Sequence, residues 1–105
     1  MVKNVTSDQL KKTVLSERMP AIVLFTGTWC VDCTAFRPTW QKWSNARDGP
    51  ILVLEIRRGD HAWDDWSIRE IPTVIAYKDG KELGRASDQI SEDDLERLRD
   101  LMLRP

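Results

Sequence analysis

The chain has 105 residues, of which 41% are hydrophobic and 31% are charged, and its 16 basic and 17 acidic residues leave a formal net charge of −1. This balance is typical of one globular domain and excludes a disordered chain. It provides no basic surplus for binding nucleic acid or an anionic membrane surface, and no apolar run approaches the roughly 20 residues of a membrane span.

Strands are predicted from short apolar runs, and helices from apolar side chains spaced three or four residues apart. In the first half the predicted elements are, in chain order, a short edge strand at 2–5, a helix from Thr6 or Ser7 to about Arg18, a buried strand at 21–26, a helix from Cys30 to about Asp48, and a buried strand at 51–56. The apolar stripes of the two helices are Leu10, Val14 and Leu15, and Phe36, Trp40 and Trp43. Pro20 and Gly49-Pro50 end these helices, and Pro38 should kink the second one.

The second half predicts a closing hairpin and a final helix. Its elements are a turn at 57–60, a short helix at 61–69, a strand at 73–77, a hairpin turn at Asp79-Gly80, a returning edge strand at 82–86, and a helix capped by Ser91 and Asp94 that runs to about Leu103. The order β-α-β-α-β-α-β-β-α predicts a single α/β domain over 1–105, with a mixed sheet that helices cover on both faces.

The two cysteines, Cys30 and Cys33, lie in the segment TWCVDC (28–33), between the apolar run at 21–26 and the long predicted helix. A helix N-terminus presents free backbone N–H groups and about half a positive charge, which stabilises a thiolate, the reactive form of cysteine. Two thiols one helical turn apart can also close a disulfide. The placement therefore predicts reversible thiol–disulfide chemistry.

Two other interpretations of the cysteine pair are weaker. Buried structural thiols are common, because free cysteine packs as a small hydrophobic side chain, but a strand–helix junction is a reactive position. A zinc site needs about four ligands, whereas the chain offers two cysteines and one histidine, His61, far from a ligand spacing. The N-terminus has no apolar signal core, so we expect a cytoplasmic protein, in which Cys-x-x-Cys indicates redox or metal chemistry.

Four motifs, taken in order, resemble those of the thioredoxin family. They are Trp29-Cys30-x-x-Cys33 after the apolar strand, Pro38 five residues beyond the second cysteine, Ile71-Pro72-Thr73, and the Asp79-Gly80 hairpin. The resemblance covers nearly the whole chain and implies a thioredoxin-like fold with sheet order 1-3-2-4-5. It also implies that Cys30 is the nucleophile and Cys33 the resolving cysteine, and that Pro72 follows a cis peptide bond and faces the cysteines.

Three departures from the family pattern concern the site rather than the fold. Val31-Asp32 separates the cysteines instead of the usual Gly-Pro, which is closer to the Trp-Cys-Pro-Asp-Cys type of related proteins. The buried aspartate that ordinary thioredoxins carry in the preceding strand is replaced by Leu24, and a glycine beside the docking groove corresponds to Asp88. These departures bear on substrate range and on proton handling.

Aromatic residues and the proline loop supply the candidates for substrate binding. Trp29 is expected to shield the thiols and contact partners, the alternative being a purely packed aromatic. A cis bond before Pro72 would turn the backbone of Ile71 towards an extended substrate strand, which could pair with it. Trp63 and Trp66 flank two acidic residues and either cover the sheet or form a partner patch; packing is favoured.

Two carboxylates compete for the role left vacant by Leu24, which is to accept the proton of Cys33. Glu55 lies in an apolar strand beside the strand of Leu24, so it is placed to help; alternatively it points to water at the strand end. Asp32 is adjacent in sequence, but it can simply interact with the helix dipole.

The sequence thus predicts a thiol–disulfide oxidoreductase that reduces protein disulfides by dithiol exchange through Cys30 and Cys33, with no cofactor and no metal. The expected partners are disulfide-containing proteins and a thioredoxin reductase or another dithiol reductant. We expect a monomer that binds neither nucleic acid nor membrane. Two alternatives from another class keep the same fold: a redox-inactive binding module, and a redox sensor whose disulfide changes its binding.

Overall fold

A computed structural model describes residues 2–46, 52–57 and 61–104. Its elements, in chain order, are β1 (Val2–Asn4), α1 (Ser7–Lys11), the π-helical segment η1 (Lys12–Ser16), β2 (Ala21–Thr26), α2 (Val31–Asn45), β3 (Leu52–Arg57), α3 (Ala62–Asp65), β4 (Thr73–Lys78), β5 (Lys81–Ser87) and α4 (Glu92–Leu103). The predicted alternation of strands and helices is confirmed.

The five strands form one mixed sheet in the order β1-β3-β2-β4-β5, as predicted. β3 pairs in parallel with β1 and β2, whereas β4 pairs antiparallel with β2 and β5. The hairpin between β4 and β5 turns at Asp79 and Gly80, whose φ angles of 54° and 78° are the left-handed values that a tight two-residue turn requires. Asp and Gly are suited to this conformation, so the local sequence sets the antiparallel edge.

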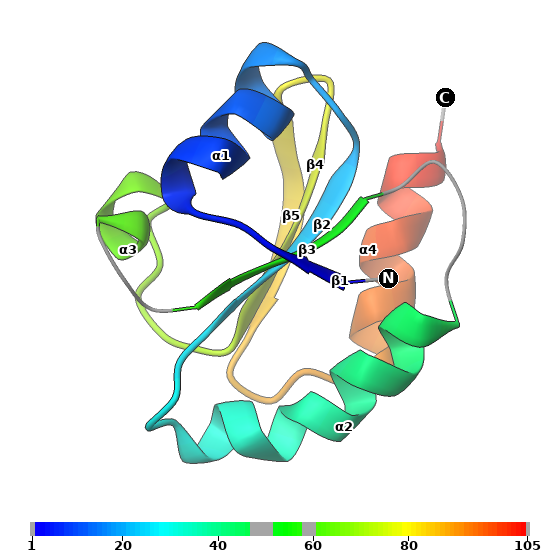
Figure 1. The fold of residues 1–105 in the computed structure, drawn as a ribbon. Helices are drawn as coiled ribbons and strands as arrows, with labels where there is room; N and C mark the ends of the chain where they lie inside the picture. Colours follow the sequence, from blue (N-terminus) through cyan, green and yellow to red (C-terminus); the bar gives the residue numbers. More distant parts are fainter. Residues whose placement is uncertain (1, 47–51, 58–60, 105) are drawn as a thin grey trace.

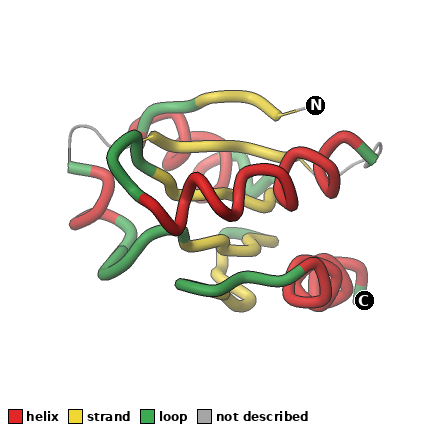
Figure 2. The backbone as a smooth tube through the Cα atoms, turned by 90° about the horizontal axis from the view of Figure 1, so that it is seen from below, coloured by secondary structure: helices red, strands yellow, loops and turns green. Residues whose placement is uncertain are grey.

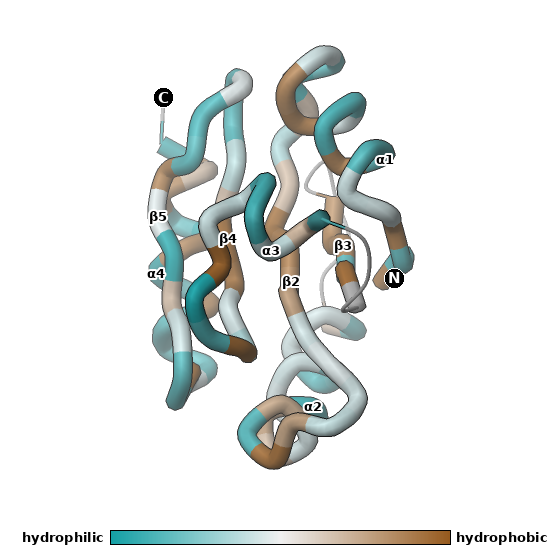
Figure 3. Tube along the Cα trace, turned by 90° about the vertical axis from the view of Figure 1, so that its left-hand side faces the viewer, coloured by the Kyte–Doolittle hydropathy of each residue, from teal (hydrophilic) through white to brown (hydrophobic). Residues whose placement is uncertain are grey.

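Helices cover both faces of the sheet, with α1 and α3 on one side and α2 and α4 on the other (Figure 1). Side chains alternate along a strand between the two faces, so the sheet fills two separate cores. The first core includes Leu10, Val14, Phe25, Trp66 and Tyr77, and the second includes Leu24, Trp40, Trp43, Leu95 and Leu98. In Figure 3 the tube of β2 carries hydrophobic colours, whereas α1 alternates between hydrophobic and hydrophilic segments.

The helices of the second face cross at a steep angle. Figure 2 looks nearly along the axis of α4, while α2 runs across the view. Ser91 caps α4 by accepting the N–H of Asp94 at 3.2 Å, and the Asp94 carboxylate accepts the N–H of Ser91 at 2.9 Å, which confirms the predicted capping box. Lys78 reaches the other end of this helix and donates to the carbonyl oxygens of Met102 and Arg104.

The first helix departs from the prediction of a regular helix to about Arg18. After α1, the hydrogen bonds of the segment η1 are π-helical, so each joins an N–H to the carbonyl five residues earlier. The N–H of Glu17, for example, donates to the carbonyl of Lys12 at 2.8 Å. A π-turn is wider than an α-turn, so it changes which side chains face the sheet. Leu15 is 47% exposed, so its assignment to the buried stripe is wrong. Arg18 adopts a left-handed φ of 55° and ends the segment.

Several other predicted boundaries change, by one residue at the end of β1, the end of β4 and both ends of β5. α2 ends at Asn45; the predicted end near Asp48 and the start of the next strand at Ile51 lie outside the described residues. β3 includes Arg57, which was predicted to open a turn whose remaining residues, 58–60, are also outside the described part. The helix predicted at 61–69 is the single turn α3, because Ser67 has a left-handed φ of 55° that an α-helix cannot contain. Pro38 lies inside α2, and its kink stays a prediction.

Candidate active site

The two cysteines form a disulfide at the start of α2. Cys30 is the N-cap residue, with an extended backbone (φ −128°, ψ 111°), and its sulfur accepts the N–H of Cys33 at 3.1 Å. The Cα atoms of the two residues are 5.2 Å apart. Cys30 is partly exposed, whereas Cys33 is only 2% exposed. One sulfur therefore faces the outside and the other lies behind it, and the two form the disulfide that a spacing of one helical turn allows.

The start of α2 provides the electrostatic environment of the pair. Thr34 donates both its N–H and its hydroxyl to the carbonyl of Cys30, at 3.0 and 3.1 Å, so this carbonyl begins the helical hydrogen bonds. The N–H groups of the first turn, that of Cys33 among them, point back towards the cap. When the disulfide is reduced, these N–H groups and the helix dipole favour a thiolate at Cys30.

The loop before β4 lies against the disulfide. The Ile71–Pro72 peptide bond is cis, as the resemblance implied. The carbonyl oxygen of Ile71 lies 3.7 Å from the sulfur of Cys30, although 41 residues separate them in the chain. The hydroxyl of Thr73 donates to the carbonyl of Glu70 at 2.6 Å and so ties the two ends of this loop together. The structure thus brings Cys30, Ile71 and Pro72 together at one end of the sheet.

Two exposed apolar side chains flank Cys30 in the chain. Trp29 is 100% exposed, so the alternative of a packed aromatic is wrong. Val31, between the cysteines, is 85% exposed. Exposed apolar side chains of this size beside a reactive group are typical of a surface that contacts a partner.

A pocket of about 330 Å³ lies behind Cys33, between the sheet and α2. Its lining includes Cys33, Leu24 and Glu55, with Arg37 on the α2 side. Leu24 and Glu55 are register partners in the parallel pair of β2 and β3, as expected for neighbouring strands. Glu55 is half-buried. This burial lies between the two predicted alternatives, a carboxylate placed near Cys33 and a carboxylate that points to water. Glu55 and Cys33 thus line the same pocket, from β3 and from α2.

Asp32 lies on another side of α2. It lines a groove together with Asp88, Gln89 and Ile90 from the segment that joins β5 to α4. Asp88 has a left-handed φ of 70°, and its N–H donates to the carbonyl of Pro72 at 3.1 Å. The sequence marked Asp88 as a departure from a family glycine, but only the structure places it opposite Asp32. This groove is the part of the site that the sequence did not predict.

The remaining aromatic candidates pack rather than gather at the disulfide. Trp66 is buried against Phe25 and Tyr77, and Trp63 packs on the same core. His61 is bonded to Asp65. Within the described ranges, no group of three or more His, Cys, Asp or Glu residues is placed to hold a metal ion, and none of the described helices is long and apolar enough to cross a membrane.

Comparison with known proteins gives a consistent result. The thioredoxin family model matches residues 1–100. The chain is 30% identical over 92 residues to the probable thioredoxin-2 of Caenorhabditis elegans, covering 85% of this chain and 63% of that protein. It is 32% identical over 84 residues to the thioredoxin of Rickettsia felis, covering 78% of this chain and 80% of the relative. The match to the Caenorhabditis elegans protein thus spans less than two thirds of that relative.

Solved structures agree on the fold. The crystal structure of the short form of thioredoxin f from spinach chloroplast superposes with a TM-score of 0.80 at 19% identity, covering 95% of this chain and 92% of that one. The family match extends over the strand, the cysteine pair, the proline loop and the closing hairpin described above. With this sheet order and a Cys-x-x-Cys pair able to form a disulfide at the start of α2, the chain belongs to the thioredoxin family.

Proposed function

We propose that this protein reduces protein disulfides through Cys30 and Cys33. The observation that carries the proposal is the asymmetry of the pair. Cys30 is partly exposed beside the Ile71 carbonyl, whereas Cys33 is buried behind it within bonding distance. An outer sulfur can be reached by a substrate, and an inner one can react only with its neighbour.

The reaction then follows in two balanced steps. The Cys30 thiolate attacks one sulfur of the substrate disulfide; an S–S bond to Cys30 forms, the substrate S–S bond breaks, and the other substrate sulfur leaves as a thiolate. Cys33 loses its proton and attacks the sulfur of Cys30. The Cys30–Cys33 disulfide forms and the first substrate sulfur is released. Two electrons pass to the substrate, and an external dithiol restores the reduced pair.

Glu55 is the acceptor that we propose for the proton of Cys33. Both side chains line the pocket of about 330 Å³, whereas Asp32 lines the groove on another side of α2. Leu24, the register partner of Glu55, supplies no titratable group. A carboxylate within reach of the thiol, directly or through one water, can take this proton.

Trp29, Ile71 and Pro72 form the proposed contact surface for the substrate. Trp29 offers an uncovered aromatic face, and an extended substrate strand could bond to the Ile71 backbone beside Cys30. Pro72 carries no N–H, so it adds no competing donor at this position. We further propose that the protein acts as a monomer in the cytoplasm, with a thioredoxin reductase or another dithiol as its reductant.

The test uses the two single cysteine variants with a protein disulfide as substrate. We expect Cys30→Ser to lose disulfide reduction, because the outer nucleophile is gone. Cys33→Ser should accumulate a mixed disulfide on Cys30, detected by mass spectrometry, and turn over poorly. Full activity in Cys30→Ser would contradict the assignment. Failure of the unchanged protein to reduce any disulfide would favour the alternative of a redox-inactive binding module.

The role of Glu55 is tested on the second step alone. In a single-turnover reaction with a small neutral disulfide, Glu55→Gln should form the mixed disulfide at the normal rate and resolve it about ten times or more slowly, since general base catalysis typically contributes about 10²–10⁴-fold. Asp32→Asn is the matched control, because it removes a carboxylate from the other side of α2. Equal resolution rates in the two variants would exclude Glu55 as the acceptor.

A further inference from the structure

A groove runs beside the disulfide, separate from the pocket behind Cys33. Its volume is about 470 Å³. One wall is the first turns of α2, and the other is the segment 88–91 that leads into α4, which Figure 1 shows next to the start of α2. The groove adjoins the proposed active site: Asp32 lies between the two cysteines in the chain, and the N–H of Asp88 donates to the carbonyl of Pro72.

The groove combines an apolar floor with acidic walls. Phe36 and Ile90 lie in it and are nearly buried. Asp32 stands on the α2 wall and Asp88 on the opposite wall, and both are exposed. Its lining among the described residues contains no lysine and no arginine. Two negative charges therefore face the same space, and no lysine or arginine of the described ranges lies between them.

Some other carboxylates of the chain are held in ion pairs. Asp65, Glu82 and Asp94 each lie within 3.0 Å of a basic side chain. Neither Asp32 nor Asp88 makes an ion pair or a side-chain hydrogen bond to any residue in the described part of the chain. The two carboxylates thus remain available to a charge that a partner brings.

We propose that this groove receives a lysine or arginine side chain of the disulfide-bearing substrate. Such a side chain matches it in two respects: its methylene stem can lie on Phe36 and Ile90, and its cationic head can lie between Asp32 and Asp88. The proposal rests on the proposed function and adds a substrate class to it. Substrates with a basic residue near the reacting cysteine are reduced faster than neutral or acidic ones.

The experiment measures kcat/KM for a set of peptide disulfides that differ at one position. Lysine, norleucine or glutamate is placed in turn two, three or four residues from the reacting cysteine. At the best position we expect the lysine peptide to exceed the norleucine peptide by about two- to fivefold, the size typical of charge pairs that stay solvated. The advantage should fall as salt is raised from 0.1 M to 1 M, since the screening length drops from about 10 Å to about 3 Å.

Variants locate the effect in the groove. Asp88→Asn should bring the ratio of kcat/KM for the lysine peptide to that for the norleucine peptide close to one, and Asp88→Lys should reverse the order of the lysine and glutamate peptides. Asp79→Asn is the matched control: Asp79 is also exposed with a left-handed φ, but lies at the opposite end of β4 from the Pro72 loop. It should keep the full preference.

Each outcome separates the groove from the reduction chemistry. Equal kcat/KM for the three peptides would overturn the groove proposal and leave the proposed function standing. An advantage that survives Asp88→Asn and Asp32→Asn would overturn it too. If no peptide is reduced, the proposed function fails. The groove proposal is then tested by the binding of cysteine-free lysine and norleucine peptides to the oxidised protein. Equal affinities overturn the groove proposal, and tighter binding of the lysine peptide supports it.

Discussion

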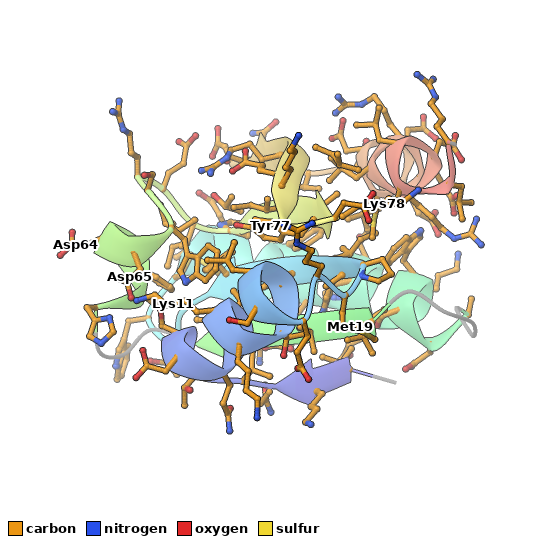
Figure 4. All side chains as sticks on the ribbon, turned by 90° about the horizontal axis from the view of Figure 1, so that it is seen from above. Lys11, Met19, Asp64, Asp65, Tyr77 and Lys78 are labelled. Carbon is orange, nitrogen blue, oxygen red and sulfur yellow. A yellow bond between two sulfur atoms is a disulfide. The ribbon has the colours of Figure 1, made fainter. Side chains whose placement is uncertain are left out.

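The contact between α1 and α3 and the surface at the start of α2 use similar side chains in opposite ways. In the first region, Asp65 accepts hydrogen bonds from Ser7 at 2.7 Å and from Lys11 at 2.9 Å, and is also bonded to His61. The indole N–H of Trp66 donates to the same Ser7 hydroxyl at 2.9 Å. Figure 4 shows Lys11 and Asp65 side by side, while Asp64 points outwards.

The second region leaves its aromatic and acidic side chains without partners from the described chain. Trp29 is fully exposed, and Asp32 and Asp88 make no ion pair there. A polar network whose members are all bonded fixes the position of the elements that carry it. Uncovered apolar and charged groups beside a reactive disulfide contribute little to folding and can contribute to binding. The first region therefore stabilises the packing of α1 and α3, and the second is accessible to a substrate.

The largest expected effect comes from exchanging the two tryptophans for alanine. Trp66→Ala should lower the free energy of unfolding by about 3–5 kcal/mol, because it leaves a cavity in a packed core. Trp29→Ala should change it by no more than about 0.5 kcal/mol, yet lower kcat/KM for protein disulfides. Urea unfolding and the reduction assay measure the two quantities. Similar losses of stability in both variants would contradict the distinction between the regions.

A smaller effect is expected from the hydroxyl that links α1 to α3. Ser7 is only 2% exposed, and Ser7→Ala would leave the buried indole N–H of Trp66 without its acceptor. We expect the free energy of unfolding to fall by about 1–3 kcal/mol, with no change in the rate of disulfide exchange. Ser16→Ala, an exposed serine of η1, is the control and should be nearly neutral. Loss of exchange activity in Ser7→Ala would show that the two regions are coupled.

Structural features that depend on a few adjacent residues could be predicted from the sequence. The capping box of Ser91 and Asp94, the buried strand at 21–26 and the Asp79-Gly80 turn each depend on a few adjacent residues, and the structure confirms them. The position of Cys30 at a strand–helix junction is equally local. The proline loop beside Cys30 was expected only from the family resemblance.

Features that depend on distant contacts were not predicted. The bond between Ser7 and Asp65 joins residues 58 positions apart, and no periodicity encodes it. Asp32 and Asp88 line the groove from two different segments of the chain. Their proximity depends on how α2 and the start of α4 pack on the sheet. The π-helical segment η1 was missed because an apolar stripe gives the same spacing signal whether a turn is bonded over four residues or five.

The pH dependence of stability provides a third test of the α1–α3 contact. The hydrogen bond and charge of Asp65 raise the pKa of His61 above its usual 6.5, with Asp8 adding to the shift and Lys11 opposing it. Hydrogen bonds from Ser7, Lys11 and His61 lower the pKa of Asp65 below its usual 3.8. A raised histidine pKa gives stability that is complete below pH 6.5 and is lost as the pH rises through the folded-state value.

The expected result is a stability difference between the unchanged protein and His61→Gln that depends on pH. It should be present at pH 5–6 and shrink as the pH rises above about 6.5. At the acid end it should persist down to about pH 4, because the lowered pKa of Asp65 keeps its carboxylate charged in the folded protein there. Thermal unfolding across pH 4–9 measures it. A difference that grows from pH 6 to pH 9 would show that the ion pair with Asp65 does not stabilise the protein. The disulfide exchange rate of His61→Gln should match the unchanged protein at each pH.

The smallest expected effect concerns Asp32, which lies in the first turn of α2 and lines the groove. Its negative charge opposes the helix N-terminus, which favours a thiolate at Cys30. Two unit charges about 7 Å apart repel by roughly 0.6 kcal/mol in water, and water is the appropriate medium because the Asp32 side chain is exposed. Removing this repulsion stabilises the reduced form, so the disulfide becomes easier to reduce. Asp32→Asn should therefore raise the reduction potential by roughly 10 mV, on the scale of about 30 mV per 1.4 kcal/mol.

Equilibration with glutathione measures this potential, and thiolate absorbance against pH measures the ionised fraction of Cys30, which should rise at a given pH in Asp32→Asn. Asp79→Asn again serves as the control, since it removes one negative charge at the far end of β4 and should leave both quantities unchanged. An unchanged or lower potential in Asp32→Asn would mean that the carboxylate interacts with the groove and not with the sulfur. In that case Asp32 would set which substrate binds, while the helix and the Ile71 loop alone would set the reactivity of Cys30.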